Sequence, residues 1–130
     1  MTIKKIATFG SILAALALSA SAAWANCQVS TRTAIGTPIS CQTTRGGFTA
    51  SSPAGTNPSN TVTVSLSNSS PAGDFRSREA RASGFSSNGT IRCTAIVFRN
   101  TGNVNSGSNT VNCSQPIVTH TVSLTASLFP

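Results

Sequence analysis

The stretch that decides the fold is TVTVSLSN, at residues 61–68. Apolar side chains occupy every second position in it, and hydroxyl side chains occupy the positions between them. A period of two is typical of a β-strand that buries one face and exposes the other to water. We therefore predict a half-buried strand at residues 61–68.

The same alternation extends to other parts of the chain. Residues 118–129 repeat it at greater length, and residues 90–99 carry apolar side chains on both faces, as a central strand covered on both sides does. Weaker strand patterns occupy residues 28–35, 39–44, 48–51 and 110–113. Short strands of this number predict an all-β fold, either a small antiparallel β-sandwich or an open barrel.

One segment departs from the strand pattern. Residues 74–84, DFRSREARASG, are rich in helix formers, with Asp74 placed as an N-cap and Gly84 placed where a helix would end. We predict at most one short helical turn from Asp74 to Gly84.

Small polar residues dominate the chain after residue 25. Of the 105 residues from Asn26 onward, 18 are Ser, 16 Thr, 10 Asn and 9 Gly, whereas Val, Ile, Leu and Phe together number 21. So few large apolar side chains place the chain at the boundary of disorder, which is the alternative to a folded domain. We expect a thin core.

The first 25 residues have the form of a cleavable secretory signal peptide. Lys4 and Lys5 precede an apolar stretch at 6–20, and Ala23-Trp24-Ala25 supplies both small residues of an A-x-A cleavage site. A retained anchor is the alternative, but it needs about 20 apolar residues. No later stretch is long and apolar enough to span a bilayer. Residues 26–130 are predicted to form a single β-domain that is secreted, periplasmic or located at the cell surface.

Four cysteines follow this leader: Cys27, Cys41, Cys93 and Cys113. An even number of cysteines in an exported chain with a thin core favours disulfides. The sequence permits three connectivities, in which Cys27 pairs with Cys41, Cys93 or Cys113. We predict Cys27–Cys41 and Cys93–Cys113, because these pairs close the two shortest loops and a hairpin that turns at residues 102–108 would place the second pair face to face. We predict no metal site, because no C-x-x-C pair is present and the chain has one histidine.

Arginine carries all the positive side-chain charge after the leader. Seven arginines against Asp74 and Glu79 give 7 − 2 = +5. The planar guanidinium suits phosphate and carboxylate groups. The candidate ligand-binding residues are Arg76, Arg78 and Arg81, for an acidic glycan, a lipid headgroup or phosphate. A merely solvated surface is the alternative interpretation.

Residues that could perform catalysis are scarce. The candidate acids and bases are His120, Asp74 and Glu79, and none lies in a recognisable catalytic motif. Glu79 and His120 with nearby arginines resemble the inventory of small secreted ribonucleases, although the chain after the leader has no Tyr or Trp. We predict that the protein is not an enzyme and has no cofactor.

The expected function is therefore a non-enzymatic β-domain with a cell-surface, matrix or adhesion role. Its expected partners are an anionic surface component or another envelope protein. The shortage of stacking aromatics argues against nucleic acid. An arginine-based binder of anionic ligands and a ribonuclease-like hydrolase are the second and third hypotheses.

The leader generates a first testable prediction. The exported protein should begin at Asn26, because the A-x-A site ends at Ala25. N-terminal sequencing of exported material measures this directly. An N-terminus at Ala23 would instead select the second candidate site, Ala20-Ser21-Ala22, and an uncleaved Met1 would contradict the leader.

Overall fold

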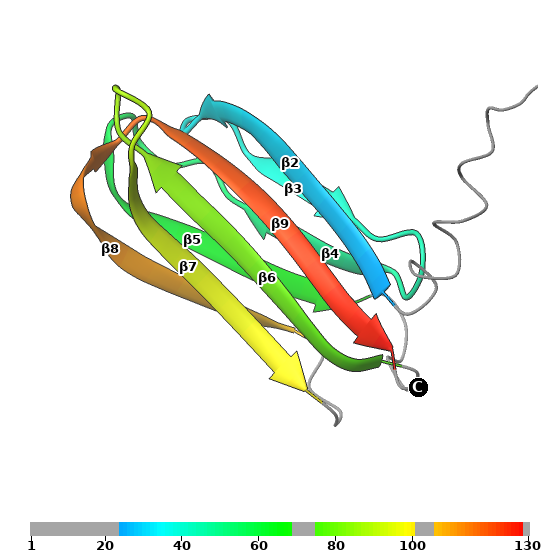
Figure 1. Cartoon of the computed structure of the whole chain (residues 1–130). Coiled ribbons are helices and arrows are strands. Elements are labelled where there is room, and N and C mark those ends of the chain that lie inside the picture. Colours follow the sequence, from blue (N-terminus) through cyan, green and yellow to red (C-terminus); the bar gives the residue numbers. More distant parts are fainter. Residues whose placement is uncertain (1–23, 69–74, 101–105, 129–130) are drawn as a thin grey trace, which may run out of the picture.

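The computed structural model describes residues 24–68, 75–100 and 106–128, which form two antiparallel sheets packed face to face (Figure 1). The strands are β2 (Trp24–Ala34), β3 (Ile39–Gln42), β4 (Phe48–Ser52), β5 (Ser59–Asn68), β6 (Phe75–Phe85), β7 (Ile91–Asn100), β8 (Gly107–Ile117) and β9 (Thr119–Leu128). The predicted all-β class, the sandwich and both disulfide pairs are confirmed.

Sheet one has the strand order β2-β9-β6-β7, and sheet two has the order β3-β4-β5-β8. Hairpins join β3 to β4, β4 to β5, and β6 to β7 within a sheet, whereas the other connections cross from one sheet to the other. The edge strands are therefore β2 and β7 in sheet one, and β3 and β8 in sheet two.

The core lies between the two inward faces. Sheet one contributes four fully buried alanines, Ala80, Ala82, Ala95 and Ala126, together with Val122 and Leu124 of β9. Sheet two contributes mainly larger side chains: Phe48, Val62, Val64 and Leu66, each at most 1% exposed. A mixture of small and large side chains allows facing layers to interdigitate.

The two clearest strand predictions hold in the structure. Residues 61–68 lie within β5, where Val62, Val64 and Leu66 point into the core. Residues 118–129 correspond to β9, which lies between β2 and β6 in sheet one. In both strands the alternation identified the buried face correctly.

The prediction that residues 90–99 form a central strand covered on both sides is wrong. β7 is an edge strand, and the outward side chains of Ile96 and Phe98 are 39% and 51% exposed. Its other face is buried through Cys93, Ala95 and Val97. The second apolar face of β7 therefore points to solvent.

The predicted helical turn from Asp74 to Gly84 is also wrong. Asp74 lies outside the described residues, and the rest of the segment belongs to β6, between β9 and β7 (Figure 1). Inward positions along β6 carry Ala80, Ala82 and Gly84, so the segment has the period of a strand. Pairing on both sides overrides the helix propensity of its Ala, Arg and Glu residues.

Each disulfide joins an edge of sheet one to an edge of sheet two. Cys27 on β2 is bonded to Cys41 on β3, and Cys93 on β7 is bonded to Cys113 on β8, with Cα–Cα distances of 5.7 and 4.6 Å. The predicted pairs are correct, but the predicted hairpin is not, because β7 and β8 belong to different sheets. The bridges close the two open sides of the sandwich.

A glycine makes room for the second bridge. Gly84 on β6 is the cross-strand partner of Cys93. A Cβ atom at Gly84 would lie 3.0 Å from the Cys93 sulfur and would collide with Ile117. A larger residue would therefore displace the bridge or the core beside it.

The exposed edge of β7 is covered by side chains. The backbone carbonyl of Arg92 accepts a hydrogen bond from Ser114 Oγ at 3.3 Å, and that of Ile96 accepts one from Asn109 Nδ2 at 3.1 Å. Both donors lie on β8. Uncovered edge carbonyls would recruit another strand, so this arrangement guards against edge-to-edge association.

β2 begins at Trp24 and thus includes two residues of the expected leader. Ala25 is buried and is the register partner of Ala126 on β9. Cleavage after Ala25 would remove the first two residues of the strand, whereas cleavage after Ala22 would leave all of it. None of the described residues forms a helix able to cross a membrane.

The bridges generate a second prediction. The substitution Cys93→Ser/Cys113→Ser should lower the free energy of unfolding by about 3 kcal/mol, because it frees a loop of roughly 20 residues in the unfolded chain. Reduction of both bridges should lower it by several kcal/mol and unfold the domain near body temperature. Urea denaturation measures both effects. Equal unfolding midpoints for oxidised and reduced protein would contradict the proposed importance of the bridges.

Candidate functional site

The three candidate arginines lie on β6 but do not form one surface. Arg76 and Arg81 are exposed, whereas Arg78 is 1% exposed and points into the core. A register irregularity between Phe75 and Ser77 separates the orientation of Arg76 from that of Arg78. The structure therefore leaves Arg76 and Arg81 as candidate surface contacts.

Arg78 contacts an aromatic ring and a backbone carbonyl inside the sandwich. Its guanidinium carbon lies 5.8 Å from the ring centre of Phe48, and Nη1 donates a 3.2 Å hydrogen bond to the carbonyl of Asn100. Burial lowers the pKa of Arg78 from its usual value, and the positive charge of Arg99 lowers it further. The Arg78 side chain therefore packs as part of the core.

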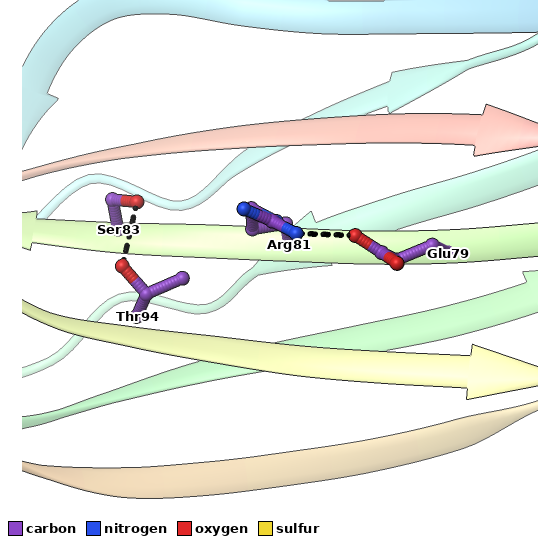
Figure 2. Close-up of polar contacts among 4 residues, drawn as sticks. All are labelled: Glu79, Arg81, Ser83 and Thr94. Carbon is purple, nitrogen blue, oxygen red and sulfur yellow. Dashed lines mark hydrogen bonds and ion pairs between the residues drawn. The ribbon is translucent and has the colours of Figure 1, made fainter.

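Arg81 is paired with Glu79 on the outer face of sheet one. Figure 2 shows the Nη2 of Arg81 directed at the Oε2 of Glu79, at 2.6 Å. Their side chains are 49% and 35% exposed, so the pair contributes little to stability. Its effect is on the surface, where each charge is balanced by the other.

The strand register extends this pair into two rows that cross all four strands of sheet one. The first row is Asn26, Thr125, Glu79 and Phe98, and the second is Gln28, Ser123, Arg81 and Ile96. All eight side chains are exposed or half-buried. We call these eight residues the outer platform.

Two open hollows indent the platform. One is lined by residues of β2, β9 and β6, including Arg81, and the other by residues of β2 and β9, including Asn26; the two share Gln28 and Ser123. Next to Arg81, the hydroxyls of Ser83 and Thr94 are 3.1 Å apart (Figure 2). The hollows thus lie on the β2–β9 side of the platform, whereas the apolar side chains Ile96 and Phe98 lie along its β7 border.

A separate basic feature lies at the turn between β6 and β7. Arg32 on β2 is exposed, and its guanidinium carbon lies 5.6 Å from the ring centre of Phe85. The adjacent hollow is lined by Arg32 together with residues 86–89 of the turn and residues 118–119. Unlike Arg81, Arg32 has no carboxylate in its hollow among the described residues.

His120 is fully buried between the sheets. Its Nε2 lies 2.7 Å from the carbonyl of Thr37, and its Nδ1 lies 2.8 Å from Ser52 Oγ. Because a carbonyl can only accept, Nε2 carries a proton and donates it to Thr37, and in the neutral imidazole Nδ1 is then the acceptor for the Ser52 hydroxyl. The order hydroxyl, imidazole, acceptor resembles that of a hydrolytic triad, but Ser52 is 1% exposed, so the group lies out of reach of a substrate.

Glu79 and His120 do not converge. Glu79 is on the outer face of β6, whereas His120 pairs in register with Gly84 and points into the core. Five residues along a strand correspond to about 17 Å, and the sheet lies between the two side chains. The geometry that acid–base catalysis by these two residues requires is absent from the described structure.

No cluster of three or more His, Cys, Asp or Glu side chains that could hold a metal occurs within residues 24–68, 75–100 and 106–128.

The platform is the feature that sequence reasoning missed. Its outward hydroxyls were visible in the alternation, but the rows depend on which strands pair and in what register, which the alternation does not reveal.

Comparison with known proteins gives little further information. No protein-family model matches the chain, and no curated protein matches it. Among solved structures, the chain is similar to the enzymatically active domain of tailspike protein 4 from bacteriophage CBA120, with 11% sequence identity and a TM-score of 0.34. The match covers 82% of this chain and 17% of that chain. A likeness at this level supports no functional argument.

The buried histidine generates a third prediction. His120→Leu should lower the free energy of unfolding by about 2 to 4 kcal/mol, because it leaves the Ser52 hydroxyl and the Thr37 carbonyl without their partner. Ser52→Ala removes one of the two hydrogen bonds and should cost about half as much. Urea denaturation of both variants, with Ser67→Ala at an exposed position of β5 as control, measures the difference. A His120→Leu protein as stable as the wild type would refute this structural role.

Proposed function

We propose that the protein is a secreted or periplasmic, non-enzymatic β-domain with a cell-surface, matrix or adhesion role. The observation that carries this proposal is the closure of both sides of the sandwich by disulfides. Disulfides persist in oxidising compartments outside the cytosol, and small exported domains use them to compensate for a thin core.

The surface chemistry supports a binding role. The exposed side chains of sheet one include two amides, a charge pair and two large apolar groups on one continuous face. The acid–base candidates in the described part of the chain, Glu79 and His120, lie on opposite faces of the sheet. The surface is thus better suited to holding a partner than to transforming one.

Arginine-based binding of anionic ligands is the second candidate. Arg32 and Arg76 are exposed, and Arg32 borders a hollow at the β6–β7 turn. A phosphate, a lipid headgroup or an acidic glycan would complement these charges. Arg78 makes no surface contribution to this candidate because it is buried.

Localisation and thiol state test the main proposal. Culture medium, envelope and cytosol should be separated, and each fraction alkylated with and without reduction. The expected result is processed protein outside the cytosol in which all four cysteines react only after reduction. Protein found only in the cytosol, unprocessed and with free thiols, would overturn the proposal.

Pull-down of an envelope or matrix component by the oxidised protein, and not by the reduced protein, tests the binding role.

Charge neutralisation tests the second candidate. The triple variant Arg32→Gln/Arg76→Gln/Arg81→Gln should weaken heparin binding and flatten its dependence on salt, because fewer guanidinium groups contact the anion. Arg45→Gln removes one positive charge elsewhere on the surface and is the control for the corresponding single substitutions. Unchanged heparin retention in the triple variant would show that these three arginines do not bind the anion.

A further inference from the structure

We propose that the outer platform is a binding site for a neutral oligosaccharide. The proposal rests on the binding role proposed above and specifies the ligand class of one surface. It is carried by the order of chemical groups along the two rows of the platform, by the balance of charge within them, and by the exposed apolar border on β7.

Both rows present the same sequence of chemical groups. Starting from β2, each has an amide, a hydroxyl, a charged group and a large apolar side chain: Asn26, Thr125, Glu79 and Phe98 in the first, and Gln28, Ser123, Arg81 and Ile96 in the second. A sugar ring carries hydroxyl groups around its edge and C–H groups on its faces. The polar positions match the edge, and the apolar border matches a face.

The polar groups supply both donors and acceptors. Amides and hydroxyls can each donate and accept, the Glu79 carboxylate accepts, and the Arg81 guanidinium donates. Neighbouring hydroxyls of one sugar could bond to Glu79 and Arg81 at once, since these two groups lie 2.6 Å apart. Hydrogen bonds to charged partners are stronger than neutral ones, which favours this pair as the anchor.

The charge of the platform favours a neutral ligand over an anion. Arg81 is the one cation of the two rows and Glu79 the one anion, and they neutralise each other. An acidic ligand would have to displace Glu79 from Arg81 or place its charge beside that carboxylate. The other exposed arginines of the described residues, Arg32, Arg45 and Arg76, lie outside both rows.

The apolar border explains the exposure of Phe98 and Ile96. These side chains are 51% and 39% exposed and lie beside Glu79 and Arg81 in the register. Aromatic rings present large apolar faces that stabilise a partner through burial and stacking. Three strand spacings of about 4.8 Å make each row about 14 Å wide, enough for a short oligosaccharide lying across the strands.

A second copy of this chain is a less favoured occupant. Strand addition at β7 would require its edge carbonyls, and two of these already accept hydrogen bonds from Ser114 and Asn109. Association through the flat face would remove the Glu79–Arg81 pair and the amides from water, whereas the apolar side chains Phe98 and Ile96 lie only along the β7 border of that face. Self-association therefore enters the experiment as an outcome that would refute the proposal.

Calorimetric titration of the oxidised protein tests the inference. The neutral probes are cellohexaose, maltoheptaose, chitohexaose and dextran, and the acidic probes are heparin and polygalacturonate. We expect at least one neutral probe to bind, with an affinity that changes little between about 50 and 500 mM salt. Phe98→Ala and Arg81→Gln should each weaken that binding about tenfold or more.

Matched variants separate the platform from the rest of the surface. Ile91→Ala removes an apolar side chain that is 54% exposed but outside both rows, and Arg76→Gln removes an exposed arginine outside them. Both should bind the neutral probe as the wild type does. All four variants should unfold at the wild-type temperature, because the altered side chains are at the surface.

Four results would overturn the inference. These are failure of every neutral probe to bind, equal binding by wild type, Phe98→Ala and Arg81→Gln, salt-sensitive binding of acidic probes alone, and dimerisation that Phe98→Ala abolishes. The third result would support the arginine-based candidate instead. Failure of the sugar site would leave the proposed role standing if the protein is exported, oxidised and still retains an envelope partner in the pull-down.

Discussion

Two covalent links between the edges of the sheets hold this sandwich closed. Cys27–Cys41 joins β2 to β3 on one side, and Cys93–Cys113 joins β7 to β8 on the other. The core between them is thin, because six of the eighteen buried hydrophobic residues in the described part of the chain are alanines. Burying an alanine gains about 0.8 kcal/mol per methyl-sized group, against about 2 kcal/mol for Leu or Val. Two bridges of about 3 kcal/mol each are therefore comparable to the whole net stability of a domain of this size.

The abundance of Ser and Thr, which placed the sequence at the boundary of disorder, has a definite place in the fold. Hydroxyl side chains occupy outward positions, where several pair across strands: Thr63 with Thr110 at 2.7 Å, Ser65 with Ser108 at 3.2 Å, and Ser83 with Thr94 at 3.1 Å. Cross-strand hydroxyl pairs contribute a few tenths of a kcal/mol each. Because one face of each sheet points to water, half of the strand positions can be polar without reducing the core. Side chains on β8 also cover the free carbonyls of β7.

The sequence predicted those features that depend on local period and on loop length. Alternation located β5 and β9 and their buried faces, and the shortest loops identified both disulfides. The sequence patterns gave wrong predictions where the structure of a segment depends on which strands lie beside it. The segment 75–85 has residues that favour a helix in isolation, yet pairing with β9 and β7 makes it a strand. The apolar residues Ile96 and Phe98 were expected to be covered, but the strand order places them at an edge. Likewise, the three arginines were visible as a cluster, whereas the burial of Arg78 depends on which face of β6 points inward. The pairing of Arg81 with Glu79 depends on the segment being a strand, in which residues i and i+2 share a face.

The two outer faces of the sandwich differ in a way that bears on recognition. On sheet two, the outward residues of β4 and β5 carry hydroxyl groups, and their partners on the edge strands add two exposed amides: Gln42 beside Thr49, and Asn112 beside Thr61. Water solvates such a face well, so displacing that water with a partner gains little. The outward face of sheet one also has hydroxyls and amides, and it differs by a charge pair and two exposed apolar side chains. Burying exposed apolar area on binding releases water, and fixed hydrogen-bond donors and acceptors beside that area orient the partner. In the proposed sugar site, Phe98 and Ile96 supply this apolar area, and the Glu79–Arg81 pair beside them supplies the fixed donor and acceptor.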